Sequence, residues 1–153
     1  MTEEDSNSVA KKELFGEILI RRNLITGEQL TRALEIQKKE GGFIGEILVK
    51  LGFMEERDVV VALVVQCNLP YIAVDKYEID RHVIELVPGE IAKKYSVVPL
   101  DRVGEVLSVV MADPLDLSVK AQLQRLTHCR VAPFIATRGE INKAIDRWYG
   151  KES

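Results

Sequence analysis

The first half of the chain is patterned for helices. Apolar side chains recur at the i, i+3, i+4 spacing that buries one face of a helix. This stripe occurs twice, at Phe15, Ile18 and Leu19 and at Ile44, Ile47 and Leu48. Each stripe is followed by a residue that tolerates the left-handed conformation of a helix end, Asn23 or Gly52. We therefore predict two short helices, one ending near each of these residues.

The two stripes belong to an internal repeat with a period of 29 residues. Residues 14–37 align with residues 43–66 without a gap, and seven of the 24 aligned positions are identical. Typical residue frequencies would give about one or two identities. Thr26 and Gln29 form a capping box, which predicts a second helix in the first copy. The repeat therefore predicts four helices arranged as two helix pairs.

Four matched positions of the repeat carry residues that a plain helical core does not require. Gln37 and Gln66 occupy places where the stripe of the second helix would take an apolar residue. Gly16 and Gly45 stand at the head of the first helix, where glycine costs about 1 kcal/mol relative to alanine. The glutamines can bond nearby carbonyls, and the glycines can serve close helix packing. Alternatively, the glutamines and the backbone amides beside the glycines bind a ligand.

From residue 69 onward, strands alternate with helices. Runs rich in apolar and β-branched residues predict strands at residues 69–74, 97–100, 106–112 and 131–136. The second and third of these form a hairpin around Gly104. Helix signals predict helices at residues 80–86, 89–95, 113–128 and 137–148, with Asp113 capping the third. We predict a small α/β sandwich of three to four strands, and an α+β fold for the whole chain.

The change of pattern sets the expected domain boundaries. A chain of 153 residues suits one ordinary domain or two small ones. We predict a flexible acidic tail, a tandem helical repeat, an α/β subdomain and a short C-terminal tail, over residues 1–12, 13–68, 69–150 and 151–153. The N-terminal methionine and the short polar tail favour a stand-alone protein over an excerpt.

Composition and charge narrow the function classes. The hydrophobic fraction of 46% and the charged fraction of 29% are those of a globular protein. The net charge is −3, with 9 basic and 12 acidic residues up to residue 68 and 12 of each after it. Neither part has the basic excess of a DNA- or RNA-binding domain. Because no apolar run approaches the roughly 20 residues of a membrane span and no secretory signal is present, we expect a cytoplasmic protein.

Catalytic and metal-binding patterns are absent from the sequence. No phosphate-binding loop, no G-x-G-x-x-G and no H-E-x-x-H motif occurs. His82 and His128 fall on different predicted helices, and Cys67 and Cys129 lack metal-ligand spacing. His128 and Cys129 are adjacent, so they do not face each other on a helix. We predict no catalytic residue, no metal and no cofactor, and hence no enzyme.

The repeat and the later segments together resemble the N-terminal region of type II secretion and type IV pilus assembly ATPases. The two copies are similar to the tandem motifs of the MshEN domain, R-L-G-x-x-L-x-x-x-G followed by L-x-x-x-L-x-x-Q. LPYIAVDKYEIDRHVIELVP, AKKYSVVPL and VLSVVMADPLDL resemble the segments that follow. The resemblance covers residues 12–148 and does not include the ATPase core.

The resemblance implies a non-enzymatic adaptor or regulatory module. Such a module docks on the cytoplasmic part of an inner-membrane secretion or pilus component, or on a motor ATPase. It would lie in the cytoplasm, held at the inner membrane by that partner and without direct insertion. Some members instead bind cyclic di-GMP, with each motif holding half of the dinucleotide. The residues that match this ligand motif are Gly16, Gln37, Gly45, Gly52 and Gln66.

The motif arginine is missing from both copies. Leu14 stands in its place in the first copy and Phe43 in the second, and Asn23 replaces the second glycine of the first motif. A guanidinium can stack on guanine and donate paired hydrogen bonds to a phosphate or an acceptor edge. We therefore expect weak binding of cyclic di-GMP or none. Arginine at positions 14 and 43 should raise the affinity if the rest of the groove is intact.

Overall fold

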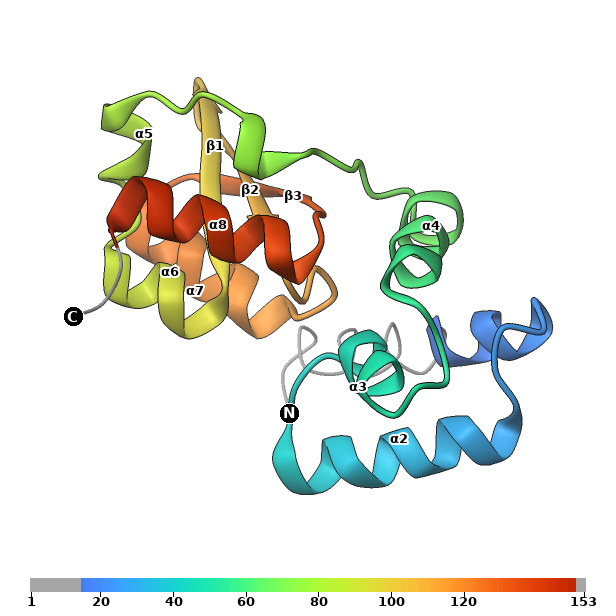
Figure 1. Cartoon of the computed structure of the whole chain (residues 1–153). Coiled ribbons are helices and arrows are strands. Elements are labelled where there is room, and N and C mark those ends of the chain that lie inside the picture. Colours follow the sequence, from blue (N-terminus) through green and yellow to red (C-terminus); the bar gives the residue numbers. More distant parts are fainter. Residues whose placement is uncertain (1–14, 151–153) are drawn as a thin grey trace. The chain divides into compact units, whose positions relative to one another are not determined.

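The computed structural model describes residues 15–150 (Figure 1). The chain divides between Asn68 and Leu69 into two compact units. The described part of the first unit is built from helices, and the second combines helices with a three-stranded sheet. The α+β fold predicted from the sequence is confirmed. The predicted tails at residues 1–12 and 151–153, and the position of Leu14, lie outside the described residues.

Within the described residues, the first unit consists of two helix pairs. The first pair is the helix at residues 15–21 and α2 (Gly27–Glu40), and the second is α3 (Ile44–Lys50) and α4 (Glu56–Cys67). Asn23 and Gly52 adopt φ angles of 60° and 80° between the members of each pair. At the start of α2, the N–H of Gln29 donates to the Thr26 hydroxyl at 3.1 Å, and the N–H of Thr26 donates to Gln29 Oε1 at 2.9 Å. The predicted helix pairs, their left-handed ends and the capping box are all confirmed.

The two apolar stripes form the core of the first unit. Their buried members are Phe15, Leu19, Ile44, Ile47 and Leu48, and Ile18 is half-buried. The rings of Phe15 and Phe43 stack with 6.0 Å between their centroids and 21° between their planes. Such an aromatic pair contributes about 0.5–1.5 kcal/mol beyond the area that it buries. Because Phe15 belongs to the first copy and Phe43 to the second, the core joins the two copies.

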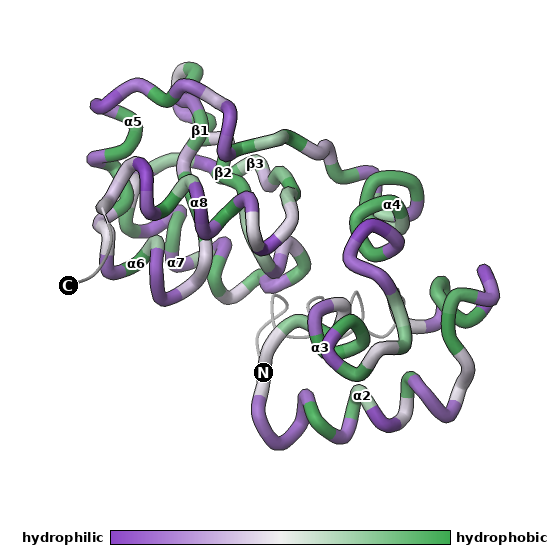
Figure 2. The backbone as a smooth tube through the Cα atoms, viewed as in Figure 1, coloured by the Kyte–Doolittle hydropathy of each residue, from purple (hydrophilic) through white to green (hydrophobic). Residues whose placement is uncertain are grey.

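A three-stranded sheet organises the second unit. Strand β1 (Val97–Val103) pairs antiparallel with β2 (Val106–Met111), and β2 pairs parallel with β3 (Arg130–Phe134). Gly104 takes φ 60° in the predicted hairpin between β1 and β2. The register shifts between Pro99 and Asp101, and this shift separates the buried first part of β1 from its exposed end. Figure 2 shows the hydrophobic character of the strands.

Helices cover the sheet. They are α5 (Arg81–Ile84), α6 (Gly89–Tyr95), α7 (Leu117–Thr127) and α8 (Arg138–Tyr149), with a short 3-10 helix η1 (Val74–Lys76). Helix α8 lies across the sheet and contacts both β1 and η1 (Figure 1). Asp80 caps α5 and Thr137 caps α8, as the sequence predicted. The core between these layers is dominated by valine, isoleucine and leucine.

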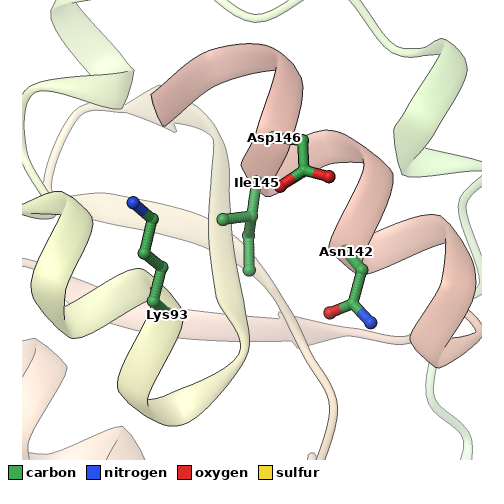
Figure 3. Close-up of a pocket in the computed structure, with 4 residues that line it drawn as sticks. All are labelled: Lys93, Asn142, Ile145 and Asp146. Atoms are coloured by element: carbon green, nitrogen blue, oxygen red, sulfur yellow. The ribbon is translucent and has the colours of Figure 1, made fainter. Parts of the chain in front are cut away.

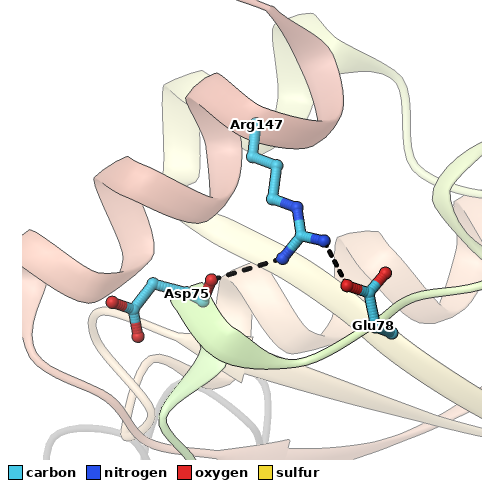
Figure 4. Close-up of polar contacts among 3 residues, drawn as sticks. All are labelled: Asp75, Glu78 and Arg147. Carbon is cyan, nitrogen blue, oxygen red and sulfur yellow. Dashed lines mark hydrogen bonds and ion pairs between the residues drawn. The ribbon is translucent and has the colours of Figure 1, made fainter.

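Arg147 connects α8 to the segment around η1. Its guanidinium donates to the Asp75 carbonyl at 3.4 Å and forms an ion pair with Glu78 (Figure 4). It also lies over the Trp148 ring, 4.6 Å from the ring centroid. The Glu78 side chain is 78% exposed, so solvent screens the pair and its contribution to stability is small. The contacts of Arg147 therefore position η1 beside α8 but add little to the stability of the fold.

The strand predicted at residues 69–74 is wrong. Tyr71 forms a single parallel bridge with Ile135, and the chain then turns into η1. The N–H of Ile72 donates to the Ile135 carbonyl at 3.0 Å, and the N–H of Ile135 donates to the Pro70 carbonyl at 2.8 Å. Because proline has no N–H to donate, the segment cannot extend this pairing toward its N-terminus.

The predicted start of α7 is also wrong, by three residues. The helix begins at Leu117 with Asp116 as its N-cap, and Asp116 Oδ1 accepts from the N–H groups of Ser118 at 3.0 Å and Val119 at 3.2 Å. Asp113 Oδ1 accepts instead from the N–H of Leu115 at 3.3 Å, which makes a turn ahead of the helix. Both aspartates accept hydrogen bonds from nearby backbone N–H groups, but only Asp116 does so at the N-terminus of the helix.

The outer edge of β3 has no unpaired donor. Backbone hydrogen bonds alternate between the two sides of a strand, so the backbone nitrogens of Val131 and Pro133, and of Ile135 just after β3, point away from β2. The N–H of Val131 donates to Gln124 Oε1 of α7 at 3.0 Å, and that of Ile135 donates to the Pro70 carbonyl. Pro133 has no N–H. The edge is therefore closed by a side chain, a proline and a neighbouring segment.

A hydrogen bond anchors Tyr71 to the start of α8. The Tyr71 hydroxyl donates to Glu140 Oε2 at 2.5 Å. This hydrogen bond, together with partial burial, raises the pKa of Tyr71 to about 12. Burial alone would raise the pKa of Glu140, but the hydrogen bonds from Tyr71 and Thr137 outweigh it and lower that pKa. The folded chain therefore favours a neutral Tyr71 beside an ionised Glu140.

We expect the chain to lose stability as the pH rises from 10 toward about 12. The pKa of Tyr71 is raised above 10.0 by folding, so the neutral hydroxyl stabilises the fold below pH 10, and this contribution disappears as the pH passes about 12. Denaturant unfolding at about pH 9 and about pH 12 measures the loss. Tyr71→Phe should lose less over the same interval, because it lacks the Tyr71 hydroxyl whose pKa is raised by folding. An equal loss in the two chains would contradict this role of Tyr71.

Candidate functional site

The five residues that match the ligand motif all lie in the first unit. Gly16 and Gly45 are buried in the first helix of each pair. Gln37 and Gln66 are half-buried near the ends of α2 and α4. Gly52 is exposed in the turn between α3 and α4. The repeat thus gives each helix pair one buried glycine and one half-buried glutamine.

Close helix packing accounts for Gly16 and Gly45. A Cβ on Gly16 would lie 2.8 Å from Leu30 Cδ1. A Cβ on Gly45 would lie 2.7 Å from Val59 Cγ1 and 2.8 Å from Phe43 Cε2. Leu30 and Val59 occupy matched positions of the repeat, so the same contact forms in both copies. The packing interpretation of these glycines is therefore supported by a contact that leaves no room for a methyl group.

Gln37 closes the turn between the two copies. Its side-chain Nε2 donates to the Gly42 carbonyl at 2.9 Å, and its backbone carbonyl accepts from the N–H of Gly41 at 2.7 Å. Gly41 and Gly42 have φ angles of 75° and 99°, which a side chain would strain. In the first copy the glutamine of the repeat therefore bonds the backbone of the linker that leads to Phe43.

Gln66 has a different partner. We orient its amide with the oxygen toward Arg22, because the opposite orientation would set its NH₂ group against guanidinium donors. The oxygen then accepts from Arg22 Nε at 3.0 Å and from Nη2 at 2.5 Å. Arg22 belongs to the first copy and Gln66 to the second, so this contact also joins the copies. The sequence analysis does not single out Arg22. The one signal that could have found it is that the matched position in the second copy, Leu51, carries no charge.

A core aromatic fills the place of the second motif arginine. Phe43 is 4% exposed, stacks on Phe15 and lies against Gly45. A cationic side chain could not occupy this environment without losing its hydration. The place of the first motif arginine, Leu14, lies outside the described residues. The substitution at position 43 has therefore converted a motif position into part of the hydrophobic core.

Two open grooves lie on the second unit, on either side of α6. One has a volume of about 370 Å³ between α6 and α8 and is lined by Lys93, Asn142, Ile145 and Asp146 (Figure 3). The other has a volume of about 360 Å³ between α6 and α7 and is lined by Ile91, Tyr95, Gln122, Arg125 and Leu126. In the second groove the Tyr95 hydroxyl donates to Gln122 Oε1 at 2.7 Å. The side chains lining each groove do not pair a nucleophile with a base.

Metal sites and membrane-spanning helices are absent from the described residues. Across residues 15–150, no three histidine, cysteine, aspartate or glutamate side chains come together as a metal site. Cys67 and Cys129 do not form a disulfide with each other. In that part of the chain, none of the helices is both long enough and apolar enough to cross a bilayer.

More than half of the chain matches a known domain family. The MshEN domain family matches residues 67–153. The chain belongs to the MshEN domain family. The matched residues comprise the second unit and the end of α4, whereas the ligand-motif residues lie in the first unit. The resemblance stated from the sequence is confirmed, with the family match on the α/β unit and not on the repeat.

Curated relatives include pilus ATPases. The chain is 38% identical to the type IV pilus assembly ATPase PilB of Myxococcus xanthus, over 90% of this chain and 24% of that protein. It is 31% identical to PilB of Thermus thermophilus, over 88% and 15%. It is also 29% identical to bacteriophage adsorption protein B of Escherichia coli K12, over 90% and 18%. The chain thus spans a quarter or less of the length of these relatives.

Solved structures share the fold of the chain. A structure of MshE with cyclic di-GMP matches with a TM-score of 0.74 and 28% identity, over 88% of this chain and 98% of that one. The N-terminal domain of XpsE matches with a TM-score of 0.70 and 21% identity, over 98% and 99%. Both matches extend beyond the second unit, so they include helices of the repeat.

Proposed function

We propose that this MshEN chain is a non-catalytic docking and regulatory module of a type IV pilus or type II secretion ATPase system. Its relatives include pilus assembly ATPases and type II secretion protein E of Xanthomonas campestris. The proposed partner is the cytoplasmic part of an inner-membrane component of such a system, or its motor ATPase. The module would then act in the cytoplasm, next to the inner membrane. The observation that carries this proposal is an apolar surface on α4.

Most residues of helix α4 after its first turn are hydrophobic (Figure 2), and they fall into a buried set and an exposed set. Its core side consists of Val59, Ala62 and Leu63, which are buried. A second set, the α4 valine face, consists of Val61, Val64 and Val65, which are 52%, 37% and 58% exposed. Their i, i+3, i+4 spacing places them on one side of the helix. Single exposed hydrophobic residues are ordinary, but adjoining ones on a helix whose core side is already satisfied indicate an interaction surface.

The charge around the α4 valine face indicates the chemistry of its partner. At the N-terminal turn of α4, three carboxylates, Glu55, Glu56 and Asp58, outnumber the one guanidinium of Arg57. Complementary charge steers association and fixes register. We therefore expect the partner to present apolar side chains flanked by lysine or arginine.

The double variant Val61→Asp, Val65→Asp should lose binding to the partner while remaining folded. Both side chains are more than half exposed, so the substitutions cost the fold little, whereas two carboxylates in an apolar interface should lower affinity by about 30-fold or more. Val103→Asp is the control, because Val103 is 74% exposed in the hairpin of the second unit. Calorimetry measures the affinity of both variants for the purified cytoplasmic domain of the inner-membrane component, and separately for the core of the motor ATPase. Unchanged affinity in the double variant would contradict the docking role of α4.

Binding of cyclic di-GMP is the second candidate function. The specific observation in its favour is the match to MshE, whose structure contains cyclic di-GMP, at 28% identity. The proposed ligand-binding residues are Gly16, Gln37, Gly45, Gly52 and Gln66. Because Phe43 is buried, we expect the affinity to be weak. Calorimetric titration with cyclic di-GMP, run beside ATP and GTP, tests this candidate, and a submicromolar dissociation constant would contradict the expected weakness.

A further inference from the structure

The described part of the repeat contains one arginine that is held by a ligand-motif glutamine. Gln66 accepts from Nε and Nη2 of Arg22 through one amide oxygen. This contact orients the guanidinium through its Nε and Nη2 atoms. The arrangement is asymmetric, because Gln37 bonds the Gly42 backbone and the matched position of Arg22 in the second copy is Leu51. The repeat therefore contains one such arginine–glutamine pair rather than two.

The pair leaves donors available. A guanidinium has five N–H donors, and Gln66 takes two of them. With its oxygen turned to Arg22, Gln66 directs its NH₂ group elsewhere, which adds two more donors. Within residues 15–150 no acidic side chain forms an ion pair with Arg22, and the side chain is exposed. The result is an oriented cation with neighbouring donors and without a counter-charge among the described residues, which suits a phosphate or the acceptor edge of guanine.

We propose that Arg22, oriented by Gln66, is the cation through which this chain contacts cyclic di-GMP, in place of the arginines absent at positions 14 and 43. The inference rests on the second proposed function. It explains how a repeat whose position 43 is filled by a core aromatic can still offer a positive charge beside a ligand-motif glutamine. It assigns one cationic contact to the ligand, from one copy of the repeat.

Arg22→Ala should lower the affinity for cyclic di-GMP by about tenfold or more, because one charge-assisted contact is lost. Arg21→Ala is the control, since Arg21 is also exposed and carries the same charge. Its affinity should change less than about twofold. Calorimetry gives the dissociation constants, and thermal melting of the same samples gives the stabilities. An equal loss of affinity in the two variants would show a general charge effect and overturn the proposal.

Gln66→Glu separates binding from a structural role. A carboxylate at position 66 accepts more strongly from Arg22 and neutralises its charge. If Arg22 binds the ligand, Gln66→Glu should keep or raise the melting temperature and still weaken binding by about tenfold. If the pair only ties the two copies together, the melting temperature should change while the affinity does not, which would overturn the inference. Wild-type binding that survives Arg22→Ala would also overturn it and leave the second candidate function standing, whereas no wild-type binding would overturn both.

Discussion

Phe43→Arg is expected to unfold the first unit and not to restore a nucleotide site. Phe43 is 4% exposed and stacks on Phe15 across the two copies. Loss of a buried phenylalanine side chain costs about 3–5 kcal/mol, and the guanidinium would add the cost of burying an unpaired charge. This sum is comparable with the whole stability of a small domain, about 5–15 kcal/mol. Urea unfolding followed by circular dichroism measures the loss.

The control for Phe43→Arg replaces a hydrophobic residue at the surface by arginine. Leu34 is 37% exposed on α2, so Leu34→Arg should change the free energy of unfolding by about 0.5 kcal/mol or less. The double variant Leu14→Arg, Phe43→Arg should behave like Phe43→Arg and bind no cyclic di-GMP. A double variant that melts like the wild type and gains affinity would show that position 43 can leave the core.

Gly45→Ala should destabilise the first unit, although alanine is the better helix former. The new Cβ would lie 2.7 Å from Val59 Cγ1, and valine has little rotamer freedom to move away. Overpacking of this kind costs about 1–3 kcal/mol, which exceeds the gain of up to about 1 kcal/mol from helix propensity. Gly16→Ala should cost less, because its nearest neighbour is the more flexible end of Leu30.

Gly27→Ala supplies the matched control for this prediction. Gly27 is also helical, in the first turn of α2, and no atom lies within 4 Å of the Cβ that alanine would add. We expect it to be neutral or slightly stabilising in the same urea titration. If Gly45→Ala and Gly27→Ala shift the unfolding midpoint equally, the close approach of α3 and α4 does not explain the glycine.

Local signals predicted most of the helical architecture. The stripes around Phe15 and Ile44 predicted two buried helix faces, and Thr26 and Thr137 predicted helix starts, because capping depends on residues only three apart. Asn23 could be assigned to a helix end for the same reason. Where competing local options existed, the prediction was wrong. Asp113 and Asp116 can both cap a helix, and only packing of the helix on the sheet decides between them.

Contacts between distant residues were outside the reach of sequence reasoning. The hydrogen bonds between Arg22 and Gln66 join residues that the repeat alignment does not pair. The motif alignment marks Phe43 only as the place of a missing ligand arginine, whereas its partner Phe15 lies in the other copy. The stripe pattern gave no sign of this stack, because position 43 precedes the helix whose periodicity it would have to follow. The roles of Arg22 and Phe43 are set by contacts between the two copies, which only the structure shows.

The closed edge of β3 bears on how densely copies of this unit can be crowded. A sheet edge with free donors can template a strand from a neighbouring molecule, which leads to fibrils or mispaired oligomers. At β3 the Gln124 side chain, Pro133 and the Pro70 carbonyl remove that option. The unit can therefore be held at high local concentration, in an oligomer or a tandem fusion, without aggregation through this edge. A partner that approaches this side of the second unit must recognise side chains and cannot add a strand here.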